Sequence, residues 1–344
     1  MKKLRIAVMM HEDLIPPDTI EGLNDKEILA WKSEYDVMAG LEALGHQVRP
    51  LGMSDDLGVI RRLIRSWKPH VVFNLLEEFH GVALYDQYVV SYLELLRLPY
   101  TGCNPRGMML ARDKAISKQI LAYHRVNTPK FTVFPVGRKV PGRRKPRRLE
   151  FPLLIKSLVE DASWGISQAS IVSSDEKLAD RVAFIHEETQ SDAIAEEFIE
   201  GRELYVGVLG NRRLQTFPIW EMCFDNMPES AAHIATARVK FDAEYQKKYG
   251  ITTRAAVDLP AGAEEKIANL CKRSYRLLSM SGYARLDLRL APDGRVYVIE
   301  ANPNPNLEYG EDFAESADSM GLSYEVLLQR ILNLGRCYQA AWRG

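Results

Sequence analysis

Polar side chains alternate with apolar ones along two segments near the C-terminus, and their spacing predicts a β-hairpin. The dipeptide Asp293-Gly294 between the segments favours a two-residue turn. Counting outward from that turn places Asp287 opposite Glu300. The same count places Arg285 opposite Asn302. All four side chains then share one face, because side chains alternate between the two faces of a strand.

The opposed carboxylates of Asp287 and Glu300 predict a bound cation. Two carboxylates about 5 Å apart repel each other and destabilise the strand pair unless a positive charge lies between them. Oxygen ligands suit Mg²⁺ or Mn²⁺ better than Zn²⁺. Two alternatives stay open: these side chains form a solvated strand face, or a three-residue loop breaks the register.

A lysine at the end of an apolar strand is a candidate phosphate ligand. The strand begins near Phe151 and ends in Lys156, and a loop of small residues follows as far as Gly165. The lysine would contact phosphates, and the backbone N–H groups of the loop would approach them. The alternative is a lysine that is simply solvated.

A polar joint between two apolar strands is a candidate nucleotide contact. It spans residues 196–203 and contains Gly201. Backbone groups at such a joint could contact a planar base, and Glu203 could accept hydrogen bonds from ribose hydroxyls. The alternative is an ordinary connection between strands.

Alternating strands and helices in the first hundred residues predict an open parallel sheet with a ligand crevice at the carboxyl ends of its strands. Glu12 and residues 77–80 follow the first and third strands and would lie at that edge. The expected strands are 4–10, 46–51, 70–76 and 99–100, and the expected helices are 25–44, 56–67 and 85–96.

The composition is that of an ordinary globular protein of two or three domains, with 344 residues, 46% hydrophobic and 26% charged. A net charge of -1 gives no overall electrostatic reason to expect nucleic-acid or membrane binding. No apolar segment approaches the length of a membrane span. The four cysteines lie far apart without a Cys-x-x-Cys motif, which predicts free thiols and a cytoplasmic location.

A basic segment, residues 137–148, interrupts this pattern. It could contact RNA, an acidic partner or an anionic substrate, or it could be a solvated loop between strands. No aromatic residues alternate with its arginines, so nothing in it supports stacking on bases.

Taken together, these motifs resemble those of the ATP-grasp superfamily, and most closely those of the D-alanine:D-alanine ligase family. The resemblance extends from the first strand to Tyr324 and depends on the order and spacing of five motifs. These are Asp113-Lys114 after residues 99–102, Ile155-Lys156, residues 196–203, Arg285-Leu286-Asp287, and residues 298–302 ending in Asn302.

The resemblance implies an α/β ATP-grasp fold in three domains. An N-terminal Rossmann-like domain would cover residues 1–112. A central ATP-grasp subdomain would cover 113–198, and a C-terminal subdomain with the metal and catalytic site would cover 199–344. Similar ligases are commonly homodimers that associate through the N-terminal domain.

It also implies roles for individual residues, with ATP and Mg²⁺ (or Mn²⁺) as cofactors. Arg285 would lie beside the reacting carbonyl, and the other catalytic candidates are Glu12 and Ser163. The remaining assignments are Lys114 and Lys156 on the ATP phosphates, Glu196, Glu197, Phe198 and Ile199 around adenine, Glu203 on the ribose, and Asp287, Glu300 and Asn302 on two metal ions.

The chemistry implied is the joining of a small-molecule carboxylate to an amine. ATP would phosphorylate the carboxylate, and the amine would attack the resulting acyl phosphate. Arg285 and backbone N–H groups near residues 304–307 are candidate donors to the tetrahedral oxyanion. Residues 237–256 occupy the position of the family's lid loop, which would exclude water.

Three departures from the family pattern concern substrate binding. The family's Gly-Ser-Ser is here Asp161-Ala162-Ser163, and the Gly-Glu-Asp-Gly run that usually follows His-Gly is missing after His80-Gly81. The turn that receives the second substrate's carboxylate carries Glu308, Glu311 and Asp312 in place of its hydroxyl donor. These acids would repel a carboxylate and favour a cationic or amine-bearing group.

We therefore predict a ligase of this type with a different acceptor. The alternatives are a genuine D-alanine:D-alanine ligase, an ATP-binding module without catalysis that docks a partner through the basic segment, and an ATP-grasp kinase that stops at a phosphorylated product.

Overall fold

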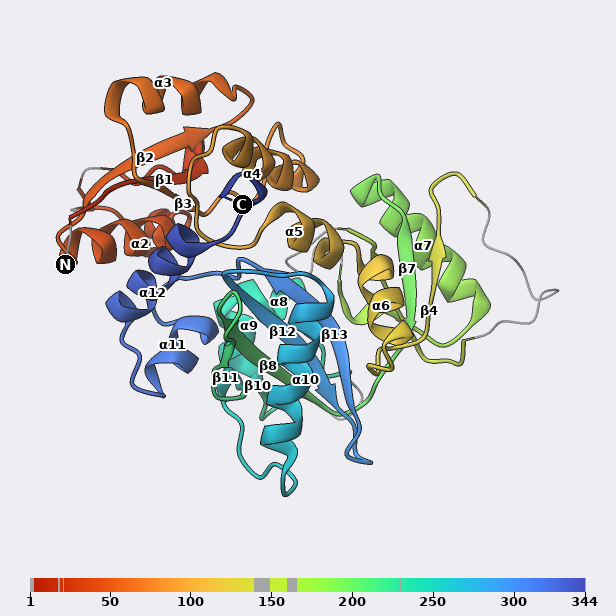
Figure 1. Ribbon diagram of the computed structural model, residues 1–344. Coiled ribbons are helices and arrows are strands. Elements are labelled where there is room, and N and C mark those ends of the chain that lie inside the picture. Colours follow the sequence, from red (N-terminus) through yellow and green to blue (C-terminus); the bar gives the residue numbers. More distant parts are fainter. Residues whose placement is uncertain are drawn as a thin grey trace.

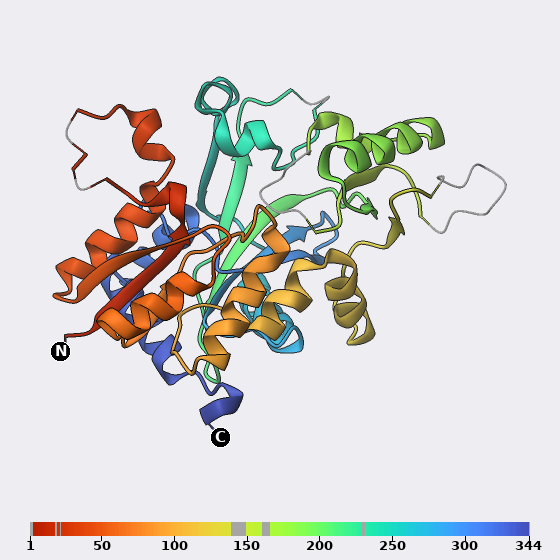
Figure 2. The same ribbon diagram turned by 90° about the horizontal axis from the view of Figure 1, so that it is seen from above.

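The computed structural model describes residues 3–17, 19–20, 22–138, 149–159, 166–228 and 231–343. Its strands form three sheets, and Figures 1 and 2 show the largest sheet lying between the other two. The structure therefore combines helices with both parallel and antiparallel sheets.

The N-terminal sheet has three parallel strands in the order β2-β1-β3. Helices α2 and α12 pack on one face, and α3 and α4 pack on the other (Figure 1). Because α12 comes from the C-terminal end of the chain, both ends of the sequence contribute to this core. The elements are β1 (Arg5–His11), η1 (Glu12–Leu14), α1 (Asp25–Leu29), α2 (Lys32–Ala43), β2 (Gln47–Met53), α3 (Gly58–Trp67), β3 (Val71–Asn74), η2 (Ala83–Tyr85), α4 (Asp86–Leu95), α11 (Asp312–Asp318), α12 (Tyr324–Cys337) and η4 (Ala341–Arg343).

The predicted alternation of strands and helices is confirmed here, with two corrections. The single helix expected over residues 25–44 is divided into α1 and α2, because the backbone leaves helical geometry at Trp31 (φ -133°, ψ 18°). The strand expected at 99–100 is reduced to one bridge, between Tyr100 and Val72.

A four-stranded antiparallel sheet has the order β4-β7-β5-β6. Leu153 and Ile155 of β5 pack with α7 on one face, so Lys156 faces the other way. The elements are β4 (Phe131–Phe134), β5 (Leu153–Ser157), η3 (Gln168–Ser170), β6 (Ile171–Val172), α7 (Asp175–Thr189) and β7 (Ala193–Glu197).

The largest sheet is antiparallel, in the order β11-β10-β8-β12-β13, and β9 adds to β8. Leu204, Leu286 and Leu288 pack against Ile267 and Tyr275 of α10, which covers one face. The intervening side chains of β8 and β12 lie on the opposite face. The elements are β8 (Arg202–Leu209), β9 (Gln215–Thr216), β10 (Trp220–Phe224), α8 (Ala237–Phe241), α9 (Ala243–Tyr249), β11 (Ile251–Ala255), α10 (Ala263–Leu277), β12 (Tyr283–Leu290) and β13 (Val296–Pro303).

Helices α5 (Pro105–Arg112) and α6 (Lys114–Tyr123) connect the N-terminal sheet to the four-stranded sheet. Asn104 caps α5 by accepting a hydrogen bond of 3.0 Å from the N–H of Gly107, and Pro105 occupies the first turn. An Asn-Pro pair at this position is a helix-start signal, although α5 was not among the helices predicted from the sequence. Asp113 caps α6 and so fixes the position of Lys114 at its start.

The β12–β13 hairpin has the predicted pairing, although its turn differs from the prediction. Asp287 lies opposite Glu300 and Arg285 opposite Asn302, which confirms the expected register. The two-residue turn is wrong: Ala291 and Arg295 close a longer loop, which shifts the pairing by one residue. A β-bulge between Asp287 and Leu288 skips one residue of β13 and restores the register.

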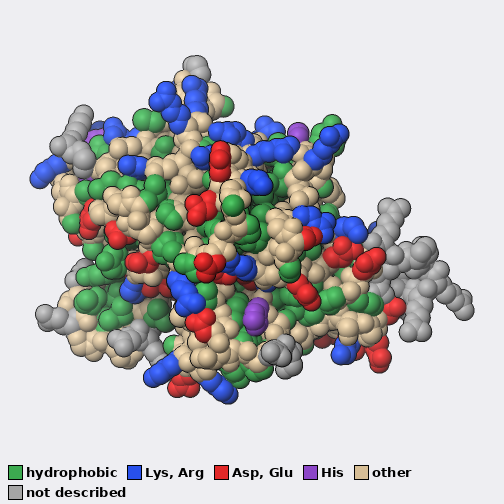
Figure 3. All heavy atoms as spheres, turned by 90° about the horizontal axis from the view of Figure 1, so that it is seen from below, with side chains coloured by type: hydrophobic (Ala, Val, Ile, Leu, Met, Phe, Trp, Pro, Cys, Tyr) green, Lys and Arg blue, Asp and Glu red, His purple; other side chains and the backbone are tan. Residues whose placement is uncertain are grey.

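The distribution of surface charge, the helix lengths and the state of the cysteines agree with what the composition predicts. On the face shown in Figure 3, acidic and basic side chains are interspersed. Within the described ranges, no helix has both the length and the apolar character needed to cross a bilayer. All four cysteines are free thiols.

Candidate active site

The hairpin face contains a buried network centred on Arg285. Its guanidinium donates two hydrogen bonds to Asp287, with Nε–Oδ1 2.8 Å and Nη2–Oδ2 3.1 Å. A third donor, Nη1, lies 3.0 Å from Oδ2 of Asp312 at the start of α11. Burial raises the pKa of Asp287 above its usual value, and the neighbouring Arg285 only partly offsets this effect. Ionisation of Asp287 is therefore less favourable here than in water, and further positive charge nearby would favour it.

Three lysines from two other elements complete this network. Lys114 lies 2.9 Å from Oε1 of Glu300. One helical turn later, Lys118 lies 2.9 Å from Oε1 of Glu196 and donates a 2.7 Å hydrogen bond to the carbonyl of Ile299, the residue that the bulge skips. Lys156 lies 3.4 Å from the same Glu196 oxygen. The fold thus brings the predicted phosphate lysines to the predicted metal carboxylates.

The carboxylates beside these lysines are held ionised. Burial alone would raise the pKa of Glu300, but Lys114 and Lys156 outweigh it and hold the pKa well below its usual range. Burial likewise opposes ionisation of Glu196, and Lys118 and Lys156 again leave its pKa lowered. Burial lowers the pKa of Lys118, although Glu196 favours its charged form. Asp287 and Glu300 therefore lie in opposite electrostatic environments despite being paired across the hairpin.

The residues predicted to hold Mg²⁺ fit such an ion. Asp287, Glu300 and Asn302 provide only oxygen ligands on one face of the hairpin. The buried Nδ2 of Asn302 has no hydrogen-bond partner, so a neighbour for this amide is missing from the described structure. Across the described ranges, no group of three or more His, Cys, Asp or Glu forms a complete metal cage. Two carboxylates and an amide suit Mg²⁺, which usually completes its shell with water and substrate phosphates.

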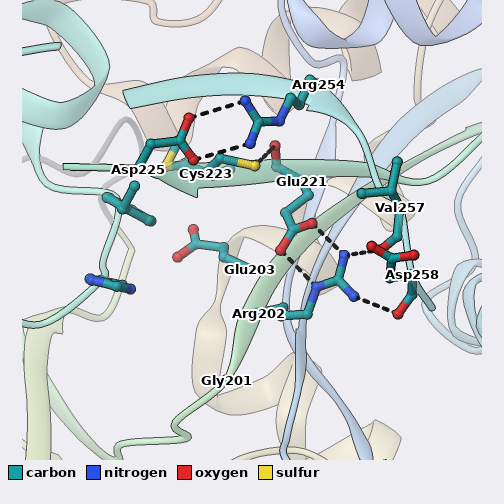
Figure 4. A pocket seen from close by; sticks show the side chains of 12 residues that line it. Gly201, Arg202, Glu203, Glu221, Cys223, Asp225, Arg254, Val257 and Asp258 are labelled. Atoms are coloured by element: carbon teal, nitrogen blue, oxygen red, sulfur yellow. Dashed lines mark hydrogen bonds and ion pairs between the residues drawn. The ribbon is translucent and has the colours of Figure 1, made fainter. Parts of the chain in front are cut away.

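Glu203 lies at a cavity of about 550 Å³ on the same side of the large sheet (Figure 4). Its Oε2 lies 2.6 Å from Nη2 of Arg289, and its Oε1 accepts a 2.8 Å hydrogen bond from the hydroxyl of Tyr205. Ion pairs between Arg202 and Glu221 and between Arg254 and Asp225 form other parts of the cavity wall. Glu203 is therefore held in place at a space large enough for a ligand.

The four residues expected around adenine differ in their surroundings. Glu196 is buried, and its carboxylate forms ion pairs with Lys118 and Lys156. Glu197 accepts from the backbone N–H of Glu150 at 3.1 Å, and the ring of Phe198 lies 5.6 Å from the guanidinium carbon of Arg289. Ile199 is half-buried. None of the four lines the Glu203 cavity, so their role in binding adenine stays a prediction.

The other catalytic candidates lie apart from the network or outside the described residues. Glu12 lies in η1 at the end of β1, as expected, but its exposed side chain forms no ion pair with described residues. Ser163 and the basic segment beyond Arg138 lie outside the described residues. The N–H of Asn304, a candidate oxyanion donor, instead donates to the carbonyl of Tyr283 at 3.4 Å.

The predicted lid, residues 237–256, and the residues just before it contact the four-stranded-sheet region. The side-chain amide of Gln168 exchanges two hydrogen bonds with the backbone of Ala232, at 2.8 and 2.9 Å. The N–H of Ala237, at the start of α8, lies 3.4 Å from the carbonyl of Ile166. Lys240 of α8 is close enough to Asp287 to favour its ionised form. The described part of the lid therefore lies near the network, and its movement stays a prediction.

Acidic residues from three elements lie near one another around Glu34. Glu34 lies on the buried face of α2, and its charged neighbours are Glu77, after β3, and Glu308, in the turn after β13. Burial raises the pKa of Glu34 to about 7, with smaller contributions from these two carboxylates.

We expect the substitution Glu34→Gln to stabilise the protein at alkaline pH. The folded-state pKa of about 7 exceeds the ordinary value of 4.5, so the folded protein binds the extra proton and its stability falls as pH rises through this window. The lost stability approaches roughly 3 kcal/mol. Urea unfolding at pH 5 and pH 8 should show a smaller pH dependence in Glu34→Gln than in the natural chain. An equal pH dependence would contradict the assignment, and exposed Glu265→Gln is the control.

Three residues of the network were not predicted from the sequence. They are Lys118, Tyr205 and Arg289. A signal was present for Lys118, because residues four apart on a helix share a face and Lys114 was already a candidate. The other two become visible only from the pairing of β8 with β12.

Comparisons with known proteins agree with this geometry. The family model of the D-ala D-ala ligase C-terminus matches residues 125–333. The uncharacterized protein y4sG of Sinorhizobium fredii is 31% identical over 309 residues, which are 87% of this chain and 85% of that protein. The D-alanine–D-alanine ligase of Desulforudis audaxviator is 28% identical over 318 residues, covering 92% of this chain and 96% of that enzyme.

Solved structures support the fold. The D-alanine–D-alanine ligase of Bacillus anthracis complexed with ATP superposes with a TM-score of 0.73 and 22% identity, covering 96% of this chain and 97% of that one. VanG D-Ala:D-Ser ligase of Enterococcus faecalis gives a TM-score of 0.69 and 18% identity, covering 97% and 100%. The predicted ATP-grasp fold is confirmed, and so is the predicted class of ATP-dependent carbon–nitrogen ligase. Because the family model covers more than half of its length, this chain belongs to the D-Ala-D-Ala ligase family.

Proposed function

We propose that this ATP-dependent ligase joins a carboxylate to an amine acceptor other than D-alanine. The observation that carries the proposal is the acidic turn after β13, which lies beside the network of lysines and carboxylates around Arg285. Asp312 of this turn lies 3.0 Å from Arg285, and Glu308 lies 3.0 Å from Lys32 of α2. Burial raises the pKa of Glu311, and the nearby Asp312 and Glu308 raise it further. A substrate carboxylate would be repelled from such a turn.

The network supports roles in phosphate and metal binding. Lys114 and Lys156 would contact the ATP phosphates, and Asp287, Glu300 and Asn302 would hold Mg²⁺. Mg²⁺ would neutralise charge on the phosphates during transfer. Binding of ATP would give Lys114 a phosphate partner in addition to Glu300.

The Glu203 cavity supports a nucleotide site. Glu203 would accept hydrogen bonds from the ribose hydroxyls, and its contacts with Arg289 and Tyr205 hold the carboxylate in one orientation. Glu196, Glu197, Phe198 and Ile199 would surround adenine, and the ring of Phe198 lies 5.6 Å from the guanidinium carbon of Arg289, the partner of Glu203.

The reaction has two bond-forming steps. A carboxylate oxygen of the first substrate attacks the γ-phosphorus of ATP, the bond to the β-phosphate oxygen breaks, and an acyl phosphate and ADP result. The amine nitrogen then attacks the acyl carbon, loses a proton, and expels phosphate. Arg285 would stabilise the oxyanion formed in that second step, and its contacts with Asp287 and Asp312 hold it on the hairpin face. The lid around α8 would keep water from the acyl phosphate.

An acceptor different from D-alanine is compatible with the family, because one structural neighbour is a D-Ala:D-Ser ligase. We also propose a cytoplasmic location on the basis of the free thiols. The three domain boundaries and a homodimer stay predictions.

The test is ADP release from ATP in the presence of amino acids, dipeptides and polyamines, supplied singly and in pairs, with mass spectrometry of the products. We expect a pair of compounds, and not D-alanine alone, to give ADP and a product lighter by one water than the two components. Omitting Mg²⁺ should abolish turnover. Full turnover with D-alanine alone at low concentration would contradict the proposed acceptor.

A further inference from the structure

One arginine joins β12 to two other segments at the cavity beside Glu203. Arg289 lies directly opposite Glu203 in the pairing of β12 with β8, and its Nη2 lies 2.6 Å from Oε2 of that carboxylate. The same nitrogen donates to the carbonyl of His233 at 2.6 Å, and Nη1 donates to the carbonyl of Gly201 at 2.9 Å. All three partners line the cavity, in which Figure 4 labels Glu203 and Gly201.

The guanidinium group of Arg289 suits this arrangement. Arg289 is only 6% exposed, and the side chain of Glu203 is 13% exposed. A guanidinium presents several N–H groups in one rigid plane, so a single group can serve a carboxylate and two carbonyls at once. Hydrogen bonds that involve a charged group are stronger than neutral ones. Arg289→Lys would keep a positive charge beside Glu203 but would lack the planar fork that reaches both carbonyls.

One of the two carbonyls belongs to residues 231–236, a segment that leads into α8 and that we call the strap. Gln168 of η3 holds the strap from the four-stranded-sheet region, because its side-chain amide forms two hydrogen bonds with the backbone of Ala232, at 2.8 and 2.9 Å. Thr236 ends the strap and caps α8 by accepting a hydrogen bond at its first turn. The position of the strap therefore sets where α8, the start of the predicted lid, begins.

We propose that Arg289 is a positioning residue that couples nucleotide binding to the strap. It holds Glu203 in the orientation that accepts from the ribose hydroxyls, and with the same guanidinium it holds the strap at the carbonyl of His233. The inference rests on the proposed nucleotide role of the Glu203 cavity and adds a link from that cavity to the lid. Such coupling is reciprocal: a nucleotide that stabilises this orientation of Glu203 also stabilises the strap, and a fixed strap favours nucleotide binding.

The first measurement is isothermal titration of ADP and, separately, 2′-deoxy-ADP into the full chain with Mg²⁺. The two probes differ by a single ribose hydroxyl. We expect the natural chain to prefer ADP by roughly 10-fold, because that hydroxyl donates to a charged acceptor. Glu203→Gln and Arg289→Met should each reduce the preference to less than about 3-fold, whereas Arg289→Lys should retain most of it.

The second measurement is hydrogen exchange of the backbone N–H groups of the strap, with and without ADP. ADP should slow their exchange roughly 10-fold in the natural chain, and by less than about 2-fold in Arg289→Met and Arg289→Lys, which both lose the fork. The matched control is Arg295→Met. Arg295 belongs to the same hairpin, pairs with Asp293 at 2.6 Å and lies over the ring of Tyr297, but its side chain is 65% exposed. This variant should behave like the natural chain in both measurements.

An ADP preference that Glu203→Gln removes and Arg289→Met leaves intact would overturn the inference alone. So would an equal slowing of strap exchange by ADP in the natural chain and in Arg289→Lys, a variant that keeps the test decisive if Arg289→Met does not fold. Failure of the proposed nucleotide site is distinguishable. It would appear as absent ADP binding, or as an ADP preference that Glu203→Gln does not reduce, and it would overturn the inference together with that site.

Discussion

Replacing Asp287 by Asn should lower ADP release by roughly a thousandfold or more without destabilising the fold. The proposed metal site loses one of its two carboxylates. Burial raises the pKa of Asp287, so the ionised side chain costs folding free energy at neutral pH, and a neutral amide removes that cost. The melting temperature at pH 8 should stay the same or rise. Arg285 keeps a carboxylate partner in Asp312.

Glu300→Gln is the informative comparison for this prediction. It should lose turnover to a similar extent, but with a lower free energy of unfolding. The pKa of Glu300 is depressed in the folded state, so its ionised form contributes stability above its ordinary pKa, and that contribution is lost as pH falls. Asp180→Asn, on the exposed surface of α7, should change neither property. Normal Mg²⁺-dependent turnover in Asp287→Asn would refute the metal assignment.

Replacing Lys118 by Met should cost about 3–5 kcal/mol of unfolding free energy. The lysine side chain is 1% exposed, and methionine fills much of its volume without its charge. The substitution leaves the buried Glu196 with Lys156 alone, at 3.4 Å, and leaves the carbonyl of Ile299 without its donor. Urea unfolding at pH 7.5 measures the loss.

The matched control is Lys130→Met. Lys130 also pairs with a glutamate, Glu197, at 3.4 Å, but its side chain is 69% exposed, and an exposed pair typically contributes less than about 1 kcal/mol. A loss in Lys118→Met no larger than in Lys130→Met would show that the buried lysine is not needed to balance Glu196.

The hairpin shows both what the sequence could predict and where it fell short. Alternation of polar side chains correctly placed Asp287 opposite Glu300. The two-residue turn expected at Asp293-Gly294 is not formed. A β-bulge farther along the hairpin restores the predicted register. A bulge cannot be predicted from the local sequence, because it depends on which groups the displaced backbone can contact. Here the displaced carbonyl of Ile299 accepts a hydrogen bond from Lys118 of α6.

The site was predictable where function follows from residue type, and less so where it follows from packing. The motifs named Lys114, Asp287 and Glu300, which the structure brings together, although their roles in binding phosphate and metal stay predictions. Lys118 and Arg289 acquire their roles from distant segments. Lys118 of α6 contacts Glu196 of β7, and Arg289 contacts Glu203 across the paired strands β8 and β12. Glu34 could have been noticed as a carboxyl on the same helix face as Val37, but its acidic neighbours come from parts of the chain that only the fold brings together.

The contact between Lys118 and the carbonyl of Ile299 also protects the margin of the largest sheet. Strand β13 is the last strand on its side, and an edge strand offers unpaired backbone groups to other chains. Here the N–H of Val298 donates to the carbonyl of Asn127 at 2.9 Å, while the next carbonyl accepts from Lys118. The bulge leaves these backbone groups without strand partners, and the segment around α6 supplies partners for them. Its contacts at the bulge therefore block the addition of a strand from another chain, which is a route to aggregation.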